Sequence, residues 1–256
     1  MIRMIMHGCN GRMGTVISNL AKENKDIEIV AGVDTYTEAN KDYPVFKSIA
    51  ECDIDADVVV DFSNAKAVDG LLDVCVKRQL PVVLCTTGLS EEQLDKVKEA
   101  TLKVAVLRSA NMSLGVNLLM ELVKKATSTL QGEGFDIEIV EKHHKHKLDA
   151  PSGTAIALAD AANEVANPKY RYNFDRSSER REREDSEIGL SAVRGGSITG
   201  EHDVIFAGLD EVITLSHTAY SRDIFGKGAL SAAMYLAGKG AGLYSMQDVI
   251  KEKLEK

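Results

Sequence analysis

Met1-Ile2-Arg3-Met4-Ile5-Met6-His7-Gly8-Cys9-Asn10-Gly11-Arg12-Met13-Gly14 joins a short apolar run to three glycines at intervals of three residues. The apolar run is typical of a buried strand, and the amphipathic run over 12–23 predicts a helix directly after it. Glycines at such a junction let the chain turn tightly and let a pyrophosphate approach the N–H groups that open the helix. Asp34, which ends the next apolar run, could hydrogen-bond a ribose diol. The pattern predicts a dinucleotide site, and a tight turn without a ligand is the alternative.

Short apolar runs alternate with longer amphipathic runs up to about residue 110, which is typical of βαβ units and a parallel sheet. The predicted strands are 2–7, 27–33, 56–62, 81–85 and 103–108, and the predicted helices are 12–23, 65–77 and 91–100. The fold class is therefore α/β, with a Rossmann-like dinucleotide-binding domain.

The pattern changes after Asn111. We expect helices over 113–129 and 154–166, and strands over 136–142, 188–193, 203–207 and 211–217. Turn residues between the last three strands favour antiparallel pairing, and the charged stretch 176–186 is expected to be a solvated loop. The second domain is thus predicted to be α+β, with a mixed or antiparallel open sheet. The predicted domains are 1–114 with 222–256, and 115–221.

Composition excludes several classes of partner. The 256 residues carry 31 Lys+Arg against 39 Asp+Glu, a formal net charge of -8, so nucleic acid and anionic membrane are poor partners. No apolar run approaches the ~20 residues of a membrane span. The four cysteines form no CxxC pair, which favours neither a zinc site nor a disulfide scaffold. We expect a cytoplasmic protein without membrane association.

One basic window interrupts this acidic sequence, Lys142-His143-His144-Lys145-His146-Lys147. If the strand from residue 136 stays extended, His143, Lys145, Lys147 and Asp149 share one face. Ser152-Gly153-Thr154 then opens a helix whose first N–H groups suit an anion, so a small dicarboxylate could lie between this turn and the lysines. A metal site is disfavoured because lysines repel cations, and a solvated basic turn is the simpler alternative.

Three further segments lie where parallel strands end, at 61–63, Cys85-Thr86-Thr87-Gly88 and Ser109-Ala110-Asn111-Met112. Ligands of open α/β sheets bind at this edge, so these segments are candidate nicotinamide loops or ordinary helix caps. Asp34 would repel a 2′-phosphate and Arg12 could offset that repulsion, which leaves NADH and NADPH both open. His7, His202 and His217 lie in apolar strand patterns and are expected to be structural.

The sequence resembles the 4-hydroxy-tetrahydrodipicolinate (dihydrodipicolinate) reductase family. The resemblance rests on Glu138-Ile139-Val140-Glu141-Lys142-His143-His144-Lys145-His146-Lys147-Leu148-Asp149-Ala150-Pro151-Ser152-Gly153-Thr154-Ala155, on Gly8 to Gly14, on Thr86-Thr87-Gly88, on Asn111 with 113–117, on Arg194-Gly195-Gly196 with Gly200-Glu201-His202, and on Ser221-Arg222. These motifs span nearly the whole chain in the family's order.

The resemblance implies an NAD(P)H-dependent reductase of diaminopimelate and lysine biosynthesis, active as a homotetramer built by the second-domain sheets. It assigns His143 and Lys147 to catalysis. His144, Gly153 and Thr154, with Ser152 of the same turn, would bind the substrate carboxylates. The cofactor residues would be Gly8, Cys9, Asn10, Gly11, Arg12, Met13, Asp34, Cys85, Thr86, Thr87, Ser109, Ala110, Asn111 and Met112.

Three positions depart from the family pattern: Cys85 stands where glycine is usual, Met112 where phenylalanine is common, and Thr35 where some members carry arginine. The first two could alter nicotinamide contacts, and the third weakens the case for NADPH. The alternative functions are a reductase of another small anionic cyclic imine and a non-catalytic dinucleotide sensor. A sensor would not need the donors at His143 and Lys147.

Overall fold

The structure is a computed structural model that describes residues 1–38, 41–177 and 180–255. The chain divides into two compact units, one made of residues 1–114 with 223–256 and the other of residues 115–222. Within the described residues, no helix is long and apolar enough to span a membrane.

The first unit contains a seven-stranded sheet in the order β12-β6-β5-β4-β1-β2-β3, and every neighbouring pair is parallel. Its strands are β1 (Ile2–His7), β2 (Ile27–Val33), β3 (Val45–Phe46), β4 (Val58–Asp61), β5 (Val82–Leu84), β6 (Ala105–Arg108) and β12 (Gly242–Tyr244). The chain runs outward from β1 through β2 to β3 and then returns to the other side of β1 as β4. Such a reversal is where doubly wound sheets bind ligands, beyond the carboxyl ends of the strands.

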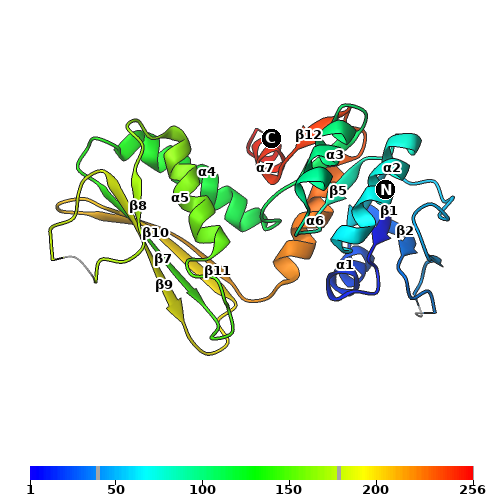
Figure 1. Cartoon of the computed structure of the whole chain (residues 1–256), viewed down its shortest axis with the longest axis horizontal. Coiled ribbons are helices and arrows are strands. Elements are labelled where there is room, and N and C mark those ends of the chain that lie inside the picture. Colours follow the sequence, from blue (N-terminus) through cyan, green and yellow to red (C-terminus); the bar gives the residue numbers. More distant parts are fainter. Residues whose placement is uncertain (39–40, 178–179, 256) are drawn as a thin grey trace. The chain divides into compact units, whose positions relative to one another are not determined.

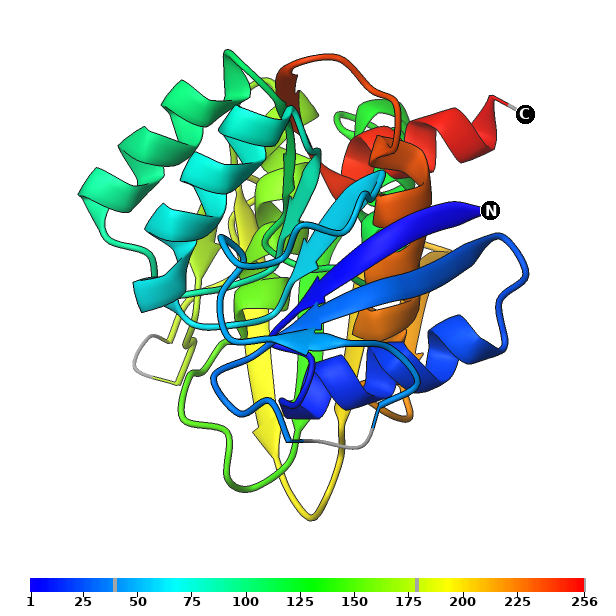
Figure 2. The same ribbon diagram turned by 90° about the vertical axis from the view of Figure 1, so that its right-hand side faces the viewer.

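Helices cover both faces of this sheet (Figure 2). They are α1 (Arg12–Lys22), α2 (Ala65–Arg78), α3 (Glu91–Thr101), α6 (Asp223–Leu236) and α7 (Met246–Leu254). Because side chains alternate along a strand, Met4 and Met6 of β1 belong to the core with α1, α6 and α7, whereas Ile5 belongs to the core with α2 and α3. Burial on both faces explains why these strands are apolar without interruption.

The second unit has a five-stranded sheet in the order β11-β10-β7-β9-β8, with α4 and α5 packed on one face (Figure 1). Its elements are α4 (Leu114–Leu130), β7 (Asp136–His143), α5 (Gly153–Val165), β8 (Arg171–Asn173), β9 (Glu187–Arg194), β10 (Gly200–Ala207) and β11 (Val212–Ala219). Ile137, Ile139, Val204 and Phe206 are buried beneath the two helices. The predicted fold class, a Rossmann-like domain with a second α+β domain, is confirmed, and the second sheet is mixed.

Pairing in the mixed sheet differs in part from the expectation. Strand β10 is antiparallel to β11, as predicted, and it is also antiparallel to β7. Strand β9, however, is parallel to β7. The prediction was wrong for β9 because helix α5 lies between the two strands in the chain, and a helical crossover returns the chain in the same direction.

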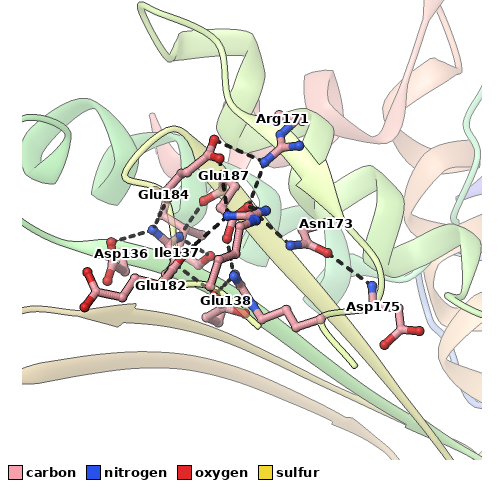
Figure 3. Close-up of polar contacts among 12 residues, drawn as sticks. Asp136, Ile137, Glu138, Arg171, Asn173, Asp175, Glu182, Glu184 and Glu187 are labelled. Carbon is pink, nitrogen blue, oxygen red and sulfur yellow. Dashed lines mark hydrogen bonds and ion pairs between the residues drawn. The ribbon is translucent and has the colours of Figure 1, made fainter. Parts of the chain in front are cut away.

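The charged stretch after β8 is not simply a solvated loop. Glu187 is fully buried, and its carboxylate accepts hydrogen bonds from Arg171 Nη2 at 3.1 Å and Asn173 Nδ2 at 3.2 Å (Figure 3). Arg176 also pairs with Glu187, and Arg183 bonds Glu138 through Nε at 3.0 Å. Burial opposes the charge of Glu187, but the ion pair with Arg176 and the bond from Asn173 lower its pKa to about 2. Residues 178 and 179 lie outside the described residues.

Candidate active site

The glycine turn after β1 is too crowded for side chains. Gly8 has a φ of +81°, and a Cβ there would lie 2.6 Å from the carbonyl oxygen of Phe62. A Cβ on Gly14 would lie 2.3 Å from the carbonyl oxygen of Gly8. The turn therefore passes directly against the end of β4, and the first turn of α1 packs on it. Both contacts require glycine.

Helix α1 begins with its N-terminus open. Gly11 is the N-cap residue and has no side chain to bond the first N–H groups, and the first turn contains no acidic residue. Those N–H groups need an acceptor, and the positive end of the helix dipole favours an anion. Arg12, the first residue of the helix, is exposed.

A cavity of about 430 Å³ lies beside this turn, at the carboxyl ends of β1, β2 and β4. Gly8 and Gly11 line it from the turn, Asp34 and Thr35 from the end of β2, and the segment 62–64 from the end of β4. Lys47 and Lys66 also line it. Its place at the reversal of strand order matches the position of dinucleotides in this fold.

Asp34 is held in a fixed orientation at this cavity. Its Oδ2 accepts a hydrogen bond from the backbone N–H of Asn10 at 3.0 Å, and its Oδ1 accepts one from the N–H of Tyr36 at 3.4 Å. The Asn10 side chain donates to the carbonyl oxygen of Tyr36 at 2.6 Å. Cys9 is fully buried, and its carbonyl oxygen accepts a bond from Lys41 Nζ at 3.1 Å. Met13 is half-buried.

His7 and Asp61 form a buried pair where β1 and β4 end. His7 Nδ1 lies 2.7 Å from Asp61 Oδ1, and the same oxygen accepts a bond from Ser63 Oγ at 2.6 Å. The pair ties the two strand ends together and fixes the turn after β4. His7, which was expected to be structural, also lines the cavity.

The other two predicted cofactor loops follow β5 and β6 and do not line this cavity. Thr86 is buried, and its Oγ1 has no hydrogen-bond partner among the described residues. Burial raises the pKa of Cys85 well above its ordinary value, so the thiol is neutral at physiological pH. The remaining loop residues are Thr87, which is exposed, and Ser109, Ala110 and Asn111.

Met112, which ends the second of these loops, is buried against α6. A Cβ on Gly228 would lie 1.6 Å from the carbonyl oxygen of Met112, so only glycine lets the helix approach this closely. The Asn111 side chain accepts a bond from the N–H of Ser113 at 2.8 Å. Helix α6 comes after the second unit in the sequence but belongs to the first unit, where it packs against the loop that ends at Met112.

In the second unit, strand β7 ends at His143 rather than continuing through the basic window. A turn follows, in which the N–H of Lys147 bonds the carbonyl oxygen of His144 at 3.1 Å. The expectation that His143, Lys145 and Lys147 share the face of one extended strand is therefore wrong. Lys147 instead pairs with Asp149, with Nζ and Oδ1 2.9 Å apart.

His143 is buried at the end of β7 and faces other polar groups. Its Nδ1 lies 2.6 Å from Oε2 of Glu141, which is fully buried. Arg194 of β9 binds both oxygens of that carboxylate, at 2.7 and 2.6 Å. The expectation from the sequence did not include Glu141 or Arg194, because their 53-residue separation leaves no local pattern.

The turn that opens α5 is where the sequence predicts an anion site. Ser152 is the N-cap residue, and its Oγ accepts a bond from the N–H of Ala155 at 3.1 Å. A Cβ on Gly153 would meet no atom within 4 Å, so the backbone there is open to a ligand. Thr154 is half-buried, and His144 has a buried Nδ1 without a hydrogen-bond partner among the described residues.

His202 of β10 lies beside His143 and was expected to be structural. The two rings pack edge to face with centroids 5.2 Å apart, and His202 Nε2 lies 3.0 Å from Ser152 Oγ. Burial lowers the pKa of His202 to about 4, and the neighbouring His143 imidazole adds to this lowering. His202 therefore stays neutral at physiological pH. Within the described part of the chain, no group of three or more His, Cys, Asp or Glu residues could hold a metal ion.

Comparison with known proteins shows the family of this chain. The family model for the N-terminal part of dihydrodipicolinate reductase matches residues 2–112, and the model for its C-terminal part matches residues 115–250. The chain belongs to the dihydrodipicolinate reductase family. The resemblance predicted from the sequence is thereby confirmed.

Relatives and solved structures of the family cover almost the whole chain. The 4-hydroxy-tetrahydrodipicolinate reductases of Caldanaerobacter subterraneus and Clostridium novyi are 55% and 49% identical, over 98% and 99% of this chain and 99% and 100% of theirs. The dipicolinate-bound dihydrodipicolinate reductase from Paenisporosarcina has a TM-score of 0.80 at 25% identity, covering 97% of this chain and 99% of that one. A myo-inositol dehydrogenase from Corynebacterium glutamicum, at 16% identity, shares the fold with a TM-score of 0.60 over 99% of this chain and 96% of that one.

Proposed function

We propose that this chain reduces 4-hydroxy-tetrahydrodipicolinate to tetrahydrodipicolinate with NADH or NADPH, as a step of diaminopimelate and lysine biosynthesis. The observation that carries the proposal is the site of the second unit, where His143, Lys147 and the N-terminal turn of α5 occur in one short segment. Reduction of a small ring that carries two carboxylates requires a group for proton transfer and groups that bind anions. His143 offers the first, and Lys147 and the N–H groups at the start of α5 offer the second.

The residues of the first unit fit a nicotinamide dinucleotide. When bound, the cofactor supplies the hydride. Gly8, Gly11 and Gly14 let the turn pack closely on itself and on the end of β4, and the N–H groups at the start of α1 would bind the pyrophosphate. Asp34 would accept hydrogen bonds from a ribose diol, since its carboxylate is already oriented by Asn10.

Other predicted cofactor residues have supporting roles in the proposal. Cys9, Arg12 and Met13 belong to the glycine turn and the start of α1, and Thr86 carries a buried hydroxyl without a partner among the described residues. The loops 85–87 and 109–112 follow the next two strands of the sheet and would contact the nicotinamide end.

The substrate would be held by its two carboxylates. Lys147 offers a positive charge, and the N–H groups of Gly153 and Thr154 lie at the positive end of the helix dipole of α5. His144, whose Nδ1 is unpartnered within the described residues, would donate a further hydrogen bond. Ser152 caps the helix and keeps this turn in place.

Proton handling would fall to His143 or Lys147. In the overall reaction one hydride and one proton are consumed and the 4-hydroxyl of the substrate leaves as water, and a positioned acid that delivers the proton contributes typically ~10²–10⁴-fold to the rate. Orientation of the dianion by Lys147 and the α5 turn adds to this by holding the reacting atoms in place.

The proposal also includes a location in the cytoplasm and assembly into a homotetramer. The face of the second sheet that α4 and α5 leave uncovered carries the exposed apolar side chains Val193 and Val212. Such a face supports assembly through the sheet, because apolar surface is stabilised by burial. Light scattering should give four times the 27.8 kDa chain mass, and a monomer would contradict the assembly.

The activity is tested by generating the substrate in situ with the preceding synthase and following oxidation of NADH and NADPH. We expect both the synthase and this chain to be required for oxidation. If neither cofactor is consumed while other small anionic cyclic imines are reduced, the substrate assignment is wrong. If the chain binds either cofactor and reduces none of these compounds, the sensor alternative is correct.

A further inference from the structure

Glu141 is the most deeply buried charged side chain near the proposed site of the second unit. It lies on the helix-covered face of β7 and is fully buried. Its carboxylate has four contacts: His143 Nδ1, both terminal nitrogens of Arg194, and the backbone N–H of Ser152 at 2.9 Å. A buried charge is costly unless its hydrogen-bonding capacity is filled, and here it is filled on both oxygens.

The arrangement keeps Glu141 ionised. Burial alone would raise the pKa of Glu141, but the hydrogen bonds from Arg194, His143 and Ser152 together lower it below its ordinary value. Arg194 bridges both carboxylate oxygens in a two-pronged geometry and also donates to the carbonyl oxygen of Asp149 at 2.7 Å. The same arginine therefore neutralises Glu141 and anchors the loop that leads to α5.

An ionised carboxylate accepts hydrogen bonds and cannot donate them. The proton in the 2.6 Å contact between Glu141 and His143 must therefore reside on Nδ1 of the imidazole. Nε2 is then the nitrogen that gains and loses a proton. It lies over Gly200, where a Cβ would be only 3.0 Å away, so glycine allows the ring to take this position.

The other groups around His143 do not replace Glu141. His202 packs against its ring and has a pKa of about 4, so it adds no charge at neutral pH. His217 lies across from His202 on β11, and burial lowers its pKa as well. Lys147 and Arg194 are cations, which cannot accept the Nδ1 proton. Within the described residues, the sole carboxylate bonded to His143 is that of Glu141.

We infer that Glu141, balanced by Arg194, is the positioning residue that fixes the tautomer and orientation of His143 and ties it to the turn that opens α5. One carboxylate oxygen holds the imidazole and the other holds Ser152 N–H. Glu141 thereby holds His143 and the turn that opens α5 at fixed positions relative to each other. The kinetic consequence of this inference rests on the proposed function, in which His143 transfers a proton. The tautomer and orientation of His143 do not depend on that function.

The kinetic test is a double-mutant cycle with Glu141→Gln and His143→Gln. Glutamine keeps the size of residue 141 but can both donate and accept, so it no longer dictates the tautomer. We expect Glu141→Gln to lower kcat by about 10- to 100-fold with a smaller change in KM. In the double variant kcat should match that of His143→Gln alone, because Glu141 acts through His143. If the double variant instead shows the product of the two separate fold-losses in kcat, the inference is overturned.

A second measurement does not depend on activity. Nitrogen NMR of imidazole should show His143 protonated on Nδ1 in the unchanged protein and a mixture of tautomers in Glu141→Gln. Glu141→Asp, which keeps the charge, should restore the Nδ1 tautomer. A His143 protonated on Nε2 in the unchanged protein would overturn the inference even if the reductase activity is confirmed. Conversely, an Nδ1 tautomer without any reductase activity would uphold the positioning and reject the proposed function.

Two further variants separate positioning from folding. Glu164→Gln removes another ion pair of α5, the one with Lys124, and should leave kcat and the His143 tautomer unchanged. If Glu141→Gln fails to fold because Arg194 loses its partner, the joint replacement Glu141→Gln with Arg194→Gln removes both charges. We expect that protein to fold and to show mixed tautomers. A single Nδ1 tautomer in it would overturn the inference.

Discussion

His143 and Lys147 lie close in the sequence but have different surroundings. His143 is buried and bonded to a buried carboxylate, whereas Lys147 follows a turn and pairs with Asp149, whose side chain is 57% exposed. The histidine is held by a buried carboxylate, as the proposed proton transfer requires, and in the proposal the lysine exchanges Asp149 for a substrate carboxylate.

This difference predicts different kinetic signatures. His143→Gln should lower kcat by about 10²-fold or more with little change in KM for the substrate, since a proton-transfer group acts in the transition state. Lys147→Met should raise that KM by about 10-fold or more, because it removes a charge from substrate binding. Steady-state kinetics at saturating NADH would test both. A His143→Gln enzyme with unchanged kcat would remove the histidine from the mechanism.

Asp34 sets a testable limit on cofactor choice. A carboxylate at the ribose end of the cavity favours a diol and repels a 2′-phosphate, although Lys47 and Lys66 line the same cavity. Asp34→Asn should lower the ratio of kcat/KM for NADH to that for NADPH by about 10-fold. An unchanged ratio would show that Asp34 does not contact the ribose.

At the scale of elements, the glycine turn between β1 and α1 has the strictest steric requirement. Gly8→Ala should raise KM for NADH by more than about 10-fold, because the new Cβ would collide with the backbone of Phe62 and displace the turn. Gly132→Ala is the matched control: its φ is +88°, but a Cβ there meets nothing within 4 Å.

The control separates backbone strain from crowding. Both variants carry the cost of a side chain at positive φ, about 1 kcal/mol. Thermal unfolding should show this loss for Gly132→Ala, and its KM for NADH should stay unchanged. Equal effects of both substitutions on KM would mean that strain, not the shape of the turn, is responsible.

The arginine network around Glu187 makes a prediction about acid stability. The pKa of Glu187 is about 2 in the folded chain against an ordinary value of 4.5, so its stabilisation is present above pH 4.5 and lost as the pH falls towards 2. Glu187→Gln should lower the free energy of unfolding at neutral pH by about 2 kcal/mol. Urea denaturation at neutral and acidic pH should show the difference from the unchanged protein shrinking on acidification.

The neighbouring Glu182 provides a control for that prediction. It is exposed, and the sole contact recorded for it among the described residues is through its backbone carbonyl, which accepts a bond from Arg181. Glu182→Gln should leave stability unchanged at every pH. An effect of Glu182→Gln as large as that of Glu187→Gln would show that net charge, and not the buried pairing, is responsible.

Prediction from sequence succeeded where the signal is local. Strands β1 and β2 have the predicted bounds, because each is an apolar run ended by glycine or aspartate. The strands β3, β8 and β12 were not predicted, since none of them lies in an apolar run as continuous as that of β5. The burial of Glu187 and its pairing with several arginines were also not predicted, because these arginines follow no apolar pattern.

At the scale of the whole molecule, the two units contain different candidate groups for the proposed reaction. The first unit contains the glycine turn and Asp34, and the second contains His143 and the α5 turn. The sequence predicts both of these candidate sets, because each lies in a short continuous motif. It was not sufficient to find Glu141 with Arg194, or the contact of His202 with His143, because these join separate strands of the second sheet.

The central claim is that hydride passes from a nicotinamide cofactor to the product of the preceding synthase. It is tested most directly with NADH or NADPH deuterated at the transferable position, followed by mass spectrometry of the product. The account predicts tetrahydrodipicolinate that carries one deuterium and whose formation depends on His143. A product without deuterium, or deuterium in a different imine only, would contradict it.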